Sequence, residues 1–185
     1  MSKRTTDQKL IDSCLKGQQL AFKQLYDAYV PHVLGVCIRY GILPDHRKDL
    51  IQIIFTEAFK SLSRYDATKA SFKTWLNRIA VNRTITYLKS HRNLIDTKSL
   101  ENIQEADIAL YANNDIEEQL HYKELLITLQ EMPKNYWLVF SLYVIEGYTH
   151  EEIAEQLDIS VISSRVSLNR ARKWVKNSMV NPLRV

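Results

Sequence analysis

Residues 147–175 read GYTHEEIAEQLDISVISSRVSLNRARKWV, and this stretch decides the fold of the C-terminal third of the chain. Thr149 and Glu152 have the spacing of a capping box, which predicts the start of a short helix. Ser160 is a suitable N-cap for a second helix. Six basic residues and no acid follow Asp158, so this second helix carries positive charge only. Two capped helices joined by a tight turn, the second of them basic, predict a helix-turn-helix.

The side chains of the predicted helix-turn-helix separate into two sets. The inward set is apolar and consists of Ile153, Ala154, Leu157, Ile159, Leu168, Ala171 and Val175. The outward set on the second helix consists of Ser163, Ser164, Arg165, Ser167, Asn169, Arg170, Arg172 and Lys173. Arginine pairs with guanine edges, asparagine with adenine, and serine with phosphates, so this set predicts contact with duplex DNA. An amphipathic helix with a solvated basic face is the alternative.

The chain before this motif is predicted to be helical as well, because apolar residues recur there at helical spacing. A first such run extends over residues 22–37 and contains Pro31, where we expect a kink or a change of helix. Asp45 is expected to cap the next helix. The buried stripe of that helix is Leu50, Ile51, Ile54, Phe55, Ala58, Phe59 and Leu62. A third helix has the core positions Phe72, Trp75, Leu76, Ile79, Ala80, Tyr87 and Leu88.

Between these helices and the C-terminal third the periodicity fades. Residues 96–118 contain seven acids and one base, whereas residues 64–92 contain seven bases and one acid. The acidic stretch therefore predicts a flexible tether between two basic modules. A second capping box, Asp115 with Glu118, predicts the start of a further helix. Pro133 suits the first turn of another helix, which ends near Gly147. With only 4 Gly and 4 Pro in 185 residues, we expect an all-α protein.

Several functional classes are disfavoured by the composition. The two cysteines are far apart and the five histidines are scattered, which predicts no metal site and no cofactor. His150 is expected to be a solvated residue beside a helix cap. The N-terminus lacks the apolar segment of a signal peptide, and the longest apolar stretch is too short to span a bilayer. We therefore expect a cytoplasmic protein without membrane insertion and without a catalytic site.

Two blocks of the sequence resemble a known family. The run DLIQIIFTEAFKSLSRYDATKASFKTWLNRIAVNRTITYLKSHR, residues 49–92, resembles region 2 of the sigma-70 family of bacterial transcription-initiation factors. The segments EIAEQLDIS and LNRAR in the C-terminal third resemble region 4 of that family. Both blocks occur in this order on a short chain without regions 1 and 3, which matches the extracytoplasmic-function (ECF) subgroup. Ile162 stands where the family usually has glycine.

The resemblance implies three interfaces. The Asp-Leu-x-Gln helix of the family docks on the clamp of the polymerase's largest subunit. Here the corresponding outward residues are Asp49, Gln52, Ile53, Thr56, Glu57 and Lys60. Recognition of the single-stranded −10 element is implied for the loop 66–71 and the third helix, with Asp66, Lys69, Ser71, Lys73, Thr74, Asn77, Arg78, Asn82 and Lys89. Packing is a better explanation for Phe72 and Trp75 than base stacking, because both lie on the core stripe. The helix-turn-helix would read the −35 element.

The resemblance thus predicts a sigma factor with region 2 in residues 1–93, an acidic linker in 94–117 and region 4 in 118–185. Its implied partners are core RNA polymerase, through the clamp and the flap, and promoter DNA. An anti-sigma factor is a further candidate, because members of the family often have one. Two alternatives are a stand-alone helix-turn-helix regulator and a helical interaction protein whose basic faces are incidental.

Overall fold

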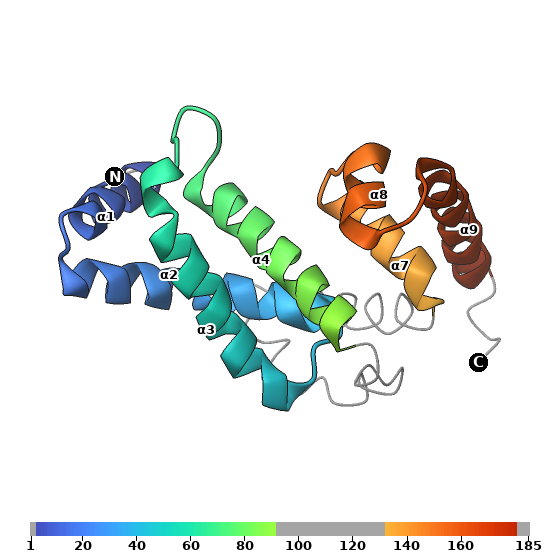
Figure 1. The fold of residues 1–185 in the computed structure, drawn as a ribbon, viewed down its shortest axis with the longest axis horizontal. Helices are drawn as coiled ribbons and strands as arrows, with labels where there is room; N and C mark the ends of the chain where they lie inside the picture. Colours follow the sequence, from blue (N-terminus) through green and yellow to red (C-terminus); the bar gives the residue numbers. More distant parts are fainter. Residues whose placement is uncertain (1–2, 92–131, 181–185) are drawn as a thin grey trace. The chain divides into compact units, whose positions relative to one another are not determined.

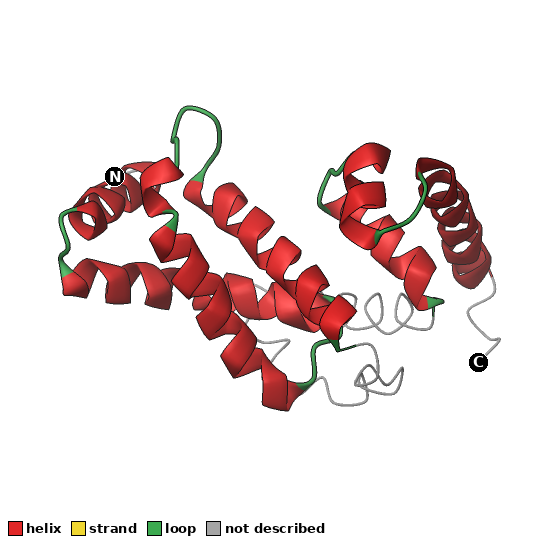
Figure 2. Ribbon diagram, in the orientation of Figure 1, coloured by secondary structure: helices red, strands yellow, loops and turns green. Residues whose placement is uncertain are grey.

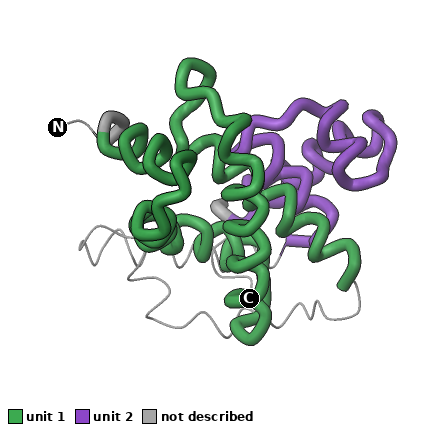
Figure 3. The backbone as a smooth tube through the Cα atoms, turned by 60° about the vertical axis from the view of Figure 1, so that its left-hand side comes forward, with its two compact units in different colours: residues 1–95, 102–111 green, residues 96–101, 112–185 purple. Residues whose placement is uncertain are grey.

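The structure is a computed structural model, which describes residues 3–91 and 132–180. All regular elements in these two ranges are helices (Figures 1 and 2), so the predicted all-α class is confirmed. The chain divides into two compact units, drawn in green and purple in Figure 3. None of the described helices is both long and apolar enough to cross a membrane. The predicted tether in residues 94–117 and the capping box at Asp115 and Glu118 lie outside the described ranges.

The described part of the first unit is a bundle of four helices with one short 3-10 turn. Its elements are α1 (Lys3–Leu15), α2 (Gln19–Arg39), α3 (Pro44–Lys60), the 3-10 turn η1 (Leu62–Arg64) and α4 (Phe72–Ser90). Helices α2, α3 and α4 pack against one another, and α1 packs against α2. Helix α1 was not predicted, because its sequence KRTTDQKLIDSCL has few apolar residues. A hydrogen bond from the Tyr29 hydroxyl to the Asp7 carboxylate helps to hold it on α2.

Two predictions about helices in this unit were not confirmed as stated. Helix α2 continues through Pro31 from Gln19 to Arg39, so a change of helix at the proline is wrong, and the alternative, a kink, stays a prediction. Helix α3 has Leu43 as its N-cap and Pro44 in its first turn, and Asp45 therefore lies inside the helix. Proline is favoured at the first helical position because its fixed φ suits the helix and its missing N–H is not needed there. Asp45 still interacts favourably with the positive end of the helix.

The predicted apolar stripes form the core of the first unit. On α3, Leu50, Ile54 and Ala58 are at most 2% exposed. On α4 the core face differs from the predicted one, since Val81, Thr84 and Ile85 are buried together with Phe72, Leu76, Ala80 and Leu88. The reason is that α4 packs against both α2 and α3, so it is covered on two sides. The predicted core residues Trp75, Ile79 and Tyr87 are only half-buried. The opposite face of α3 remains outside the bundle.

The second unit is smaller. Its described residues form α7 (Lys134–Phe140), the π-helical turn η3 (Ser141–Ile145), α8 (His150–Leu157) and α9 (Val161–Val180). Both α7 and α8 pack on α9. The apolar core of this unit includes Met132, Trp137 and Ala171, with Trp174 and Val175 packed against them. Leu168 and Ala171 are buried and Val175 is half-buried, as the inward set of the sequence predicted.

The predicted caps of the helix-turn-helix are confirmed. The Thr149 hydroxyl accepts a hydrogen bond from the Glu152 backbone N–H at 3.2 Å, and the Glu152 carboxylate accepts one from the Thr149 N–H at 2.9 Å. Asp158 ends α8 in the left-handed conformation, at φ 57°. The Ser160 hydroxyl then accepts a hydrogen bond from the Ser163 N–H at 3.0 Å, which fixes the start of α9. The turn between the two helices is therefore set by local side chains.

Candidate functional surfaces

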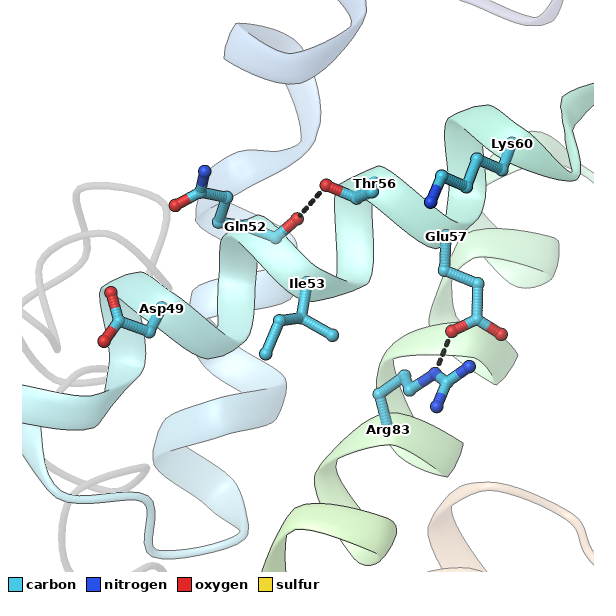
Figure 4. A pocket seen from close by; sticks show the side chains of 7 residues that line it. All are labelled: Asp49, Gln52, Ile53, Thr56, Glu57, Lys60 and Arg83. Carbon is cyan, nitrogen blue, oxygen red and sulfur yellow. Dashed lines mark hydrogen bonds and ion pairs between the residues drawn. The ribbon is translucent and has the colours of Figure 1, made fainter.

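The outward face of α3 lines a shallow groove in the first unit (Figure 4). Its lining residues are Asp49, Gln52, Ile53, Thr56, Glu57, Lys60 and Arg83. Six of these are the outward residues that the sequence predicted on α3, and the structure brings them together along one helix face. Arg83 comes from α4 and was not predicted. The groove is thus a surface shared by two helices.

Arg83 donates a hydrogen bond from its Nε to the Glu57 carboxylate, and this ion pair joins α4 to α3 across the groove (Figure 4). The two side chains are 43% and 37% exposed, so the pair contributes little to stability but restricts where Glu57 points. Spacing along one helix could not reveal this contact, because the two residues lie 26 positions apart. One signal was present in the sequence, since Arg83 is the single charged residue in residues 79–88.

An apolar side chain occupies the middle of this groove. Ile53 is 51% exposed and lies one turn from Asp49 and one turn from Glu57. The Thr56 hydroxyl donates to the Gln52 carbonyl at 2.8 Å, which turns it back onto its own helix. An exposed apolar residue with polar and charged residues around it is the composition of a protein-binding surface.

The loop between η1 and α4 is ordered by its own hydrogen bonds. The Asp66 carboxylate accepts bonds from the Thr68 N–H at 2.9 Å and the Thr68 hydroxyl at 2.6 Å. These bonds, with a smaller contribution from Lys69, hold the pKa of Asp66 below its ordinary value. The Tyr65 hydroxyl donates to the Ala70 carbonyl at 3.1 Å and closes the loop. The loop therefore presents a defined backbone and a charged Asp66.

The outward positions predicted on α4 are found on its surface. Lys73, Thr74, Arg78 and Lys89 are exposed, whereas Asn77 and Asn82 are half-buried. Ser71 caps the helix by accepting a hydrogen bond from the Thr74 N–H at 3.1 Å. Phe72 is 1% exposed, as expected for a core residue, and it packs against the half-buried Trp75 with ring centroids 5.6 Å apart.

On α9, most of the predicted outward set is exposed, with two exceptions. Exposed residues are Ser163, Arg165, Asn169, Arg170, Arg172 and Lys173, while Ser167 is half-buried. Ser164 is completely buried, so its predicted outward position was wrong. It lies four residues before Leu168 and therefore continues the inward stripe that Leu168 and Ala171 form. Ser164 has no place on the candidate DNA surface.

The buried Ser164 hydroxyl has a specific partner. It lies 2.9 Å from Nδ1 of His150, and the imidazole ring stacks on Tyr143 with centroids 4.6 Å apart. His150 was predicted to be solvated, and the structure corrects this, since the ring is half-buried between three elements. Burial lowers the pKa of His150 below 6.5, and nearby Arg165 contributes to this shift. A neutral imidazole thus connects α8, η3 and α9.

Two arginines of α9 rest on tyrosine rings. Arg170 lies 5.9 Å above the Tyr136 ring and donates a hydrogen bond to its hydroxyl at 3.1 Å. Arg172 lies 5.9 Å from the centre of the Tyr143 ring. Cation–π contacts of this kind attract the guanidinium group to the face of the tyrosine ring. The basic face of the helix is therefore partly preorganised. Among the described residues no cluster of His, Cys, Asp or Glu could hold a metal ion.

Arg165 is held more loosely. Its guanidinium lies 3.8 Å from the Glu151 carboxylate, and both side chains are about two-thirds exposed. Solvent screens such a pair, so its contribution to stability is small. Arg165 can therefore exchange this carboxylate for a DNA phosphate or base edge at little cost.

Comparison with known proteins matches a family model to each of the two units. The model of sigma-70 region 2 matches residues 25–94, and that of sigma-70 region 4 matches residues 122–175. The chain is 31% identical to the ECF RNA polymerase sigma-E factor of Escherichia coli K12, covering 99% of this chain and 98% of that protein. It is 28% identical to the sigma-E factor of Haemophilus influenzae, covering 99% of this chain and 100% of that protein.

A solved structure, CnrH in complex with the cytosolic domain of CnrY, aligns with a TM-score of 0.49 at 23% identity. The alignment covers 94% of this chain and 96% of that one. The family assignment rests on the two region models and on the full-length relatives. The chain belongs to the ECF subgroup of the sigma-70 family, whose members bind core RNA polymerase and promoter DNA and direct transcription initiation without being enzymes.

Proposed function

We propose that this sigma factor divides its tasks among the surfaces described above. The α3 groove docks on the clamp of the polymerase's largest subunit. The 66–71 loop and the outward face of α4 hold the melted −10 strand, and the outward face of α9 binds the −35 duplex. The observation that carries the docking assignment is the exposed Ile53 among the charged lining residues of the groove. A groove with an apolar centre suits a protein partner better than a phosphate backbone.

The charge of the other two surfaces supports DNA as their partner. The α4 surface carries Lys73, Arg78 and Lys89, and α9 contains no acid along its whole length. Such faces attract phosphates and release counterions when DNA binds. A base pulled out of the duplex needs a pocket of fixed shape, and the hydrogen-bonded loop beginning at Asp66 can provide one.

We also propose the domain limits 1–93 for region 2, 94–117 for a linker and 118–185 for region 4. A cytoplasmic location follows from the function, because the polymerase and the chromosome are there. Region 4 would additionally contact the polymerase flap. An anti-sigma factor that covered the α3 groove would keep the protein from the polymerase. A stand-alone regulator is not supported, because region 2 is present at the expected place.

The test is transcription in vitro with core polymerase on a fragmented genome, followed by sequencing of the transcript starts. We expect discrete starts preceded by shared −10 and −35 elements. Replacing the 66–71 loop with that of a relative should change the preferred −10 base and leave polymerase affinity unchanged. An unchanged −10 element after this exchange would place the specificity on α4, with Arg78 and Asn82 as the next candidates.

A further inference from the structure

The start of α9 carries two exposed apolar side chains. Ile162 is 74% exposed and Val166 is 44% exposed. They lie four residues apart, so both project from the same side of the helix as Arg165 and Asn169. Neither contributes to the core of the second unit, whose inward stripe runs through Ser164, Leu168 and Ala171 on the other side. Burial among the described residues of this unit therefore does not account for them.

Their position indicates what covers them. In a helix-turn-helix, the N-terminal part of the second helix enters the major groove and its side chains face the base edges. Ile162 and Val166 occupy this part of α9, whereas Arg170, Arg172 and Lys173 follow towards the C-terminus. The major groove offers one strongly apolar group, the C5-methyl group of thymine. We propose that Ile162 and Val166 are specificity-determining residues that read thymine methyl groups in the −35 element.

The spacing of the two residues agrees with this role. Four residues of α-helix advance about 6 Å, which is nearly two base steps of about 3.4 Å. The two side chains can thus reach methyl groups on neighbouring or next-neighbouring pairs. Arg165 lies between them in sequence and is available for a guanine edge or a phosphate. The basic, acid-free helix around them disfavours a cationic protein surface as the partner.

This inference rests on the proposed role of α9 in −35 recognition, and the experiment separates the two. Holoenzyme is first used to select promoter duplexes from the fragmented genome. Each thymine of the selected −35 element is then replaced by deoxyuridine, which removes only the methyl group. Wild-type holoenzyme should bind about two- to fivefold more weakly at one or two positions, as expected for losing one buried methyl contact.

The decisive comparison uses Ile162→Ala and Val166→Ala, which should fold normally because both side chains are exposed. Each variant should be insensitive to deoxyuridine at one of those positions, while Leu15→Ala, a change at an exposed apolar residue of α1, should behave like wild type. Arg165→Ala and Arg170→Ala serve as the second arm. The proposed recognition of thymine methyl groups is overturned by the following result. The two arginine variants weaken −35 binding, but deoxyuridine changes binding equally for wild type, Ile162→Ala and Val166→Ala. If none of the α9 variants affects −35 binding, the proposed function of α9 fails as well.

Discussion

The outward faces of α3 and α9 are built in the same way but differ in chemistry. Each lies opposite an apolar stripe, and each was located from helical periodicity. The α3 groove mixes acids and bases around the exposed Ile53, and one of its acids is held by an arginine from α4. The α9 face has no acid, and two of its arginines rest on tyrosines. A face of balanced charge with an apolar centre suits a protein, whereas an acid-free face suits phosphates.

The largest expected effect concerns the binding of the α3 groove to polymerase. Asp49→Lys combined with Gln52→Ala should weaken binding to core polymerase at least about 100-fold, because a reversed charge and a lost amide fall in one interface. Both residues are exposed, so the free energy of unfolding should change by no more than about 0.5 kcal/mol. Fluorescence anisotropy of labelled protein titrated with core polymerase measures the affinity.

Asp27→Lys is the matched control for this variant, since Asp27 is an exposed acid on α2 outside the groove. It should bind polymerase like wild type. Unchanged polymerase binding by the groove variant would move the docking surface elsewhere. Loss of helical signal in circular dichroism would mean that the buried and exposed faces of α3 were assigned incorrectly.

The next largest effect concerns the binding of α9 to −35 DNA. Arg165→Ala and Arg170→Ala should each weaken −35 binding by about 1–3 kcal/mol if the guanidinium contacts a base edge. A phosphate contact would instead reduce binding equally for all sequences and lower the salt slope by about one. Holoenzyme binding to promoter duplexes at several salt concentrations distinguishes these contacts, with Glu155→Gln on α8 as a control. Unchanged affinity and salt slope would remove both arginines from the interface.

Much of this architecture could be predicted from the sequence, because helical period, caps and charge are local properties. The stripe from Leu50 to Leu62 and the capping box at Thr149 needed no knowledge of the tertiary structure. Contacts between elements were not accessible in this way. The pairing of Arg83 with Glu57 depends on how α3 meets α4. Helix α1 was missed because a polar helix has little periodic signal.

The error at Ser164 has another origin, because its spacing to Leu168 is a local signal that the polar side chain concealed. It supplies a smaller prediction. Ser164→Ala leaves the His150 ring without its 2.9 Å partner, which should lower the stability of the second unit by about 1 kcal/mol. Ser163→Ala, at an exposed position, should change it by less than about 0.5 kcal/mol. Hydrogen exchange of the α8 and α9 amides measures this unit separately. Equal effects of the two substitutions would show that the buried hydrogen bond contributes nothing.

The smallest effect concerns pH. Burial holds the pKa of His150 below 6.5, so the unfolded chain takes up the proton first as the pH falls. The free energy of unfolding should therefore be independent of this group above about pH 6.5 and decrease below it, towards the folded-state pKa. Titration of the His150 ring by NMR should give a lower pKa in the folded protein than in urea. A folded-state pKa equal to or above the value in urea would contradict the buried, neutral imidazole.

The central claim is that the DNA surfaces act at a promoter only when the α3 groove is bound to polymerase. Footprinting of one promoter, and of versions with spacers altered by a few base pairs, tests it most directly. The account predicts weak protection by the protein alone and strong protection of both elements with core polymerase, at the native spacer only. The Asp49→Lys, Gln52→Ala variant should give no added protection with polymerase. Equal protection of all spacers by the protein alone would contradict the account.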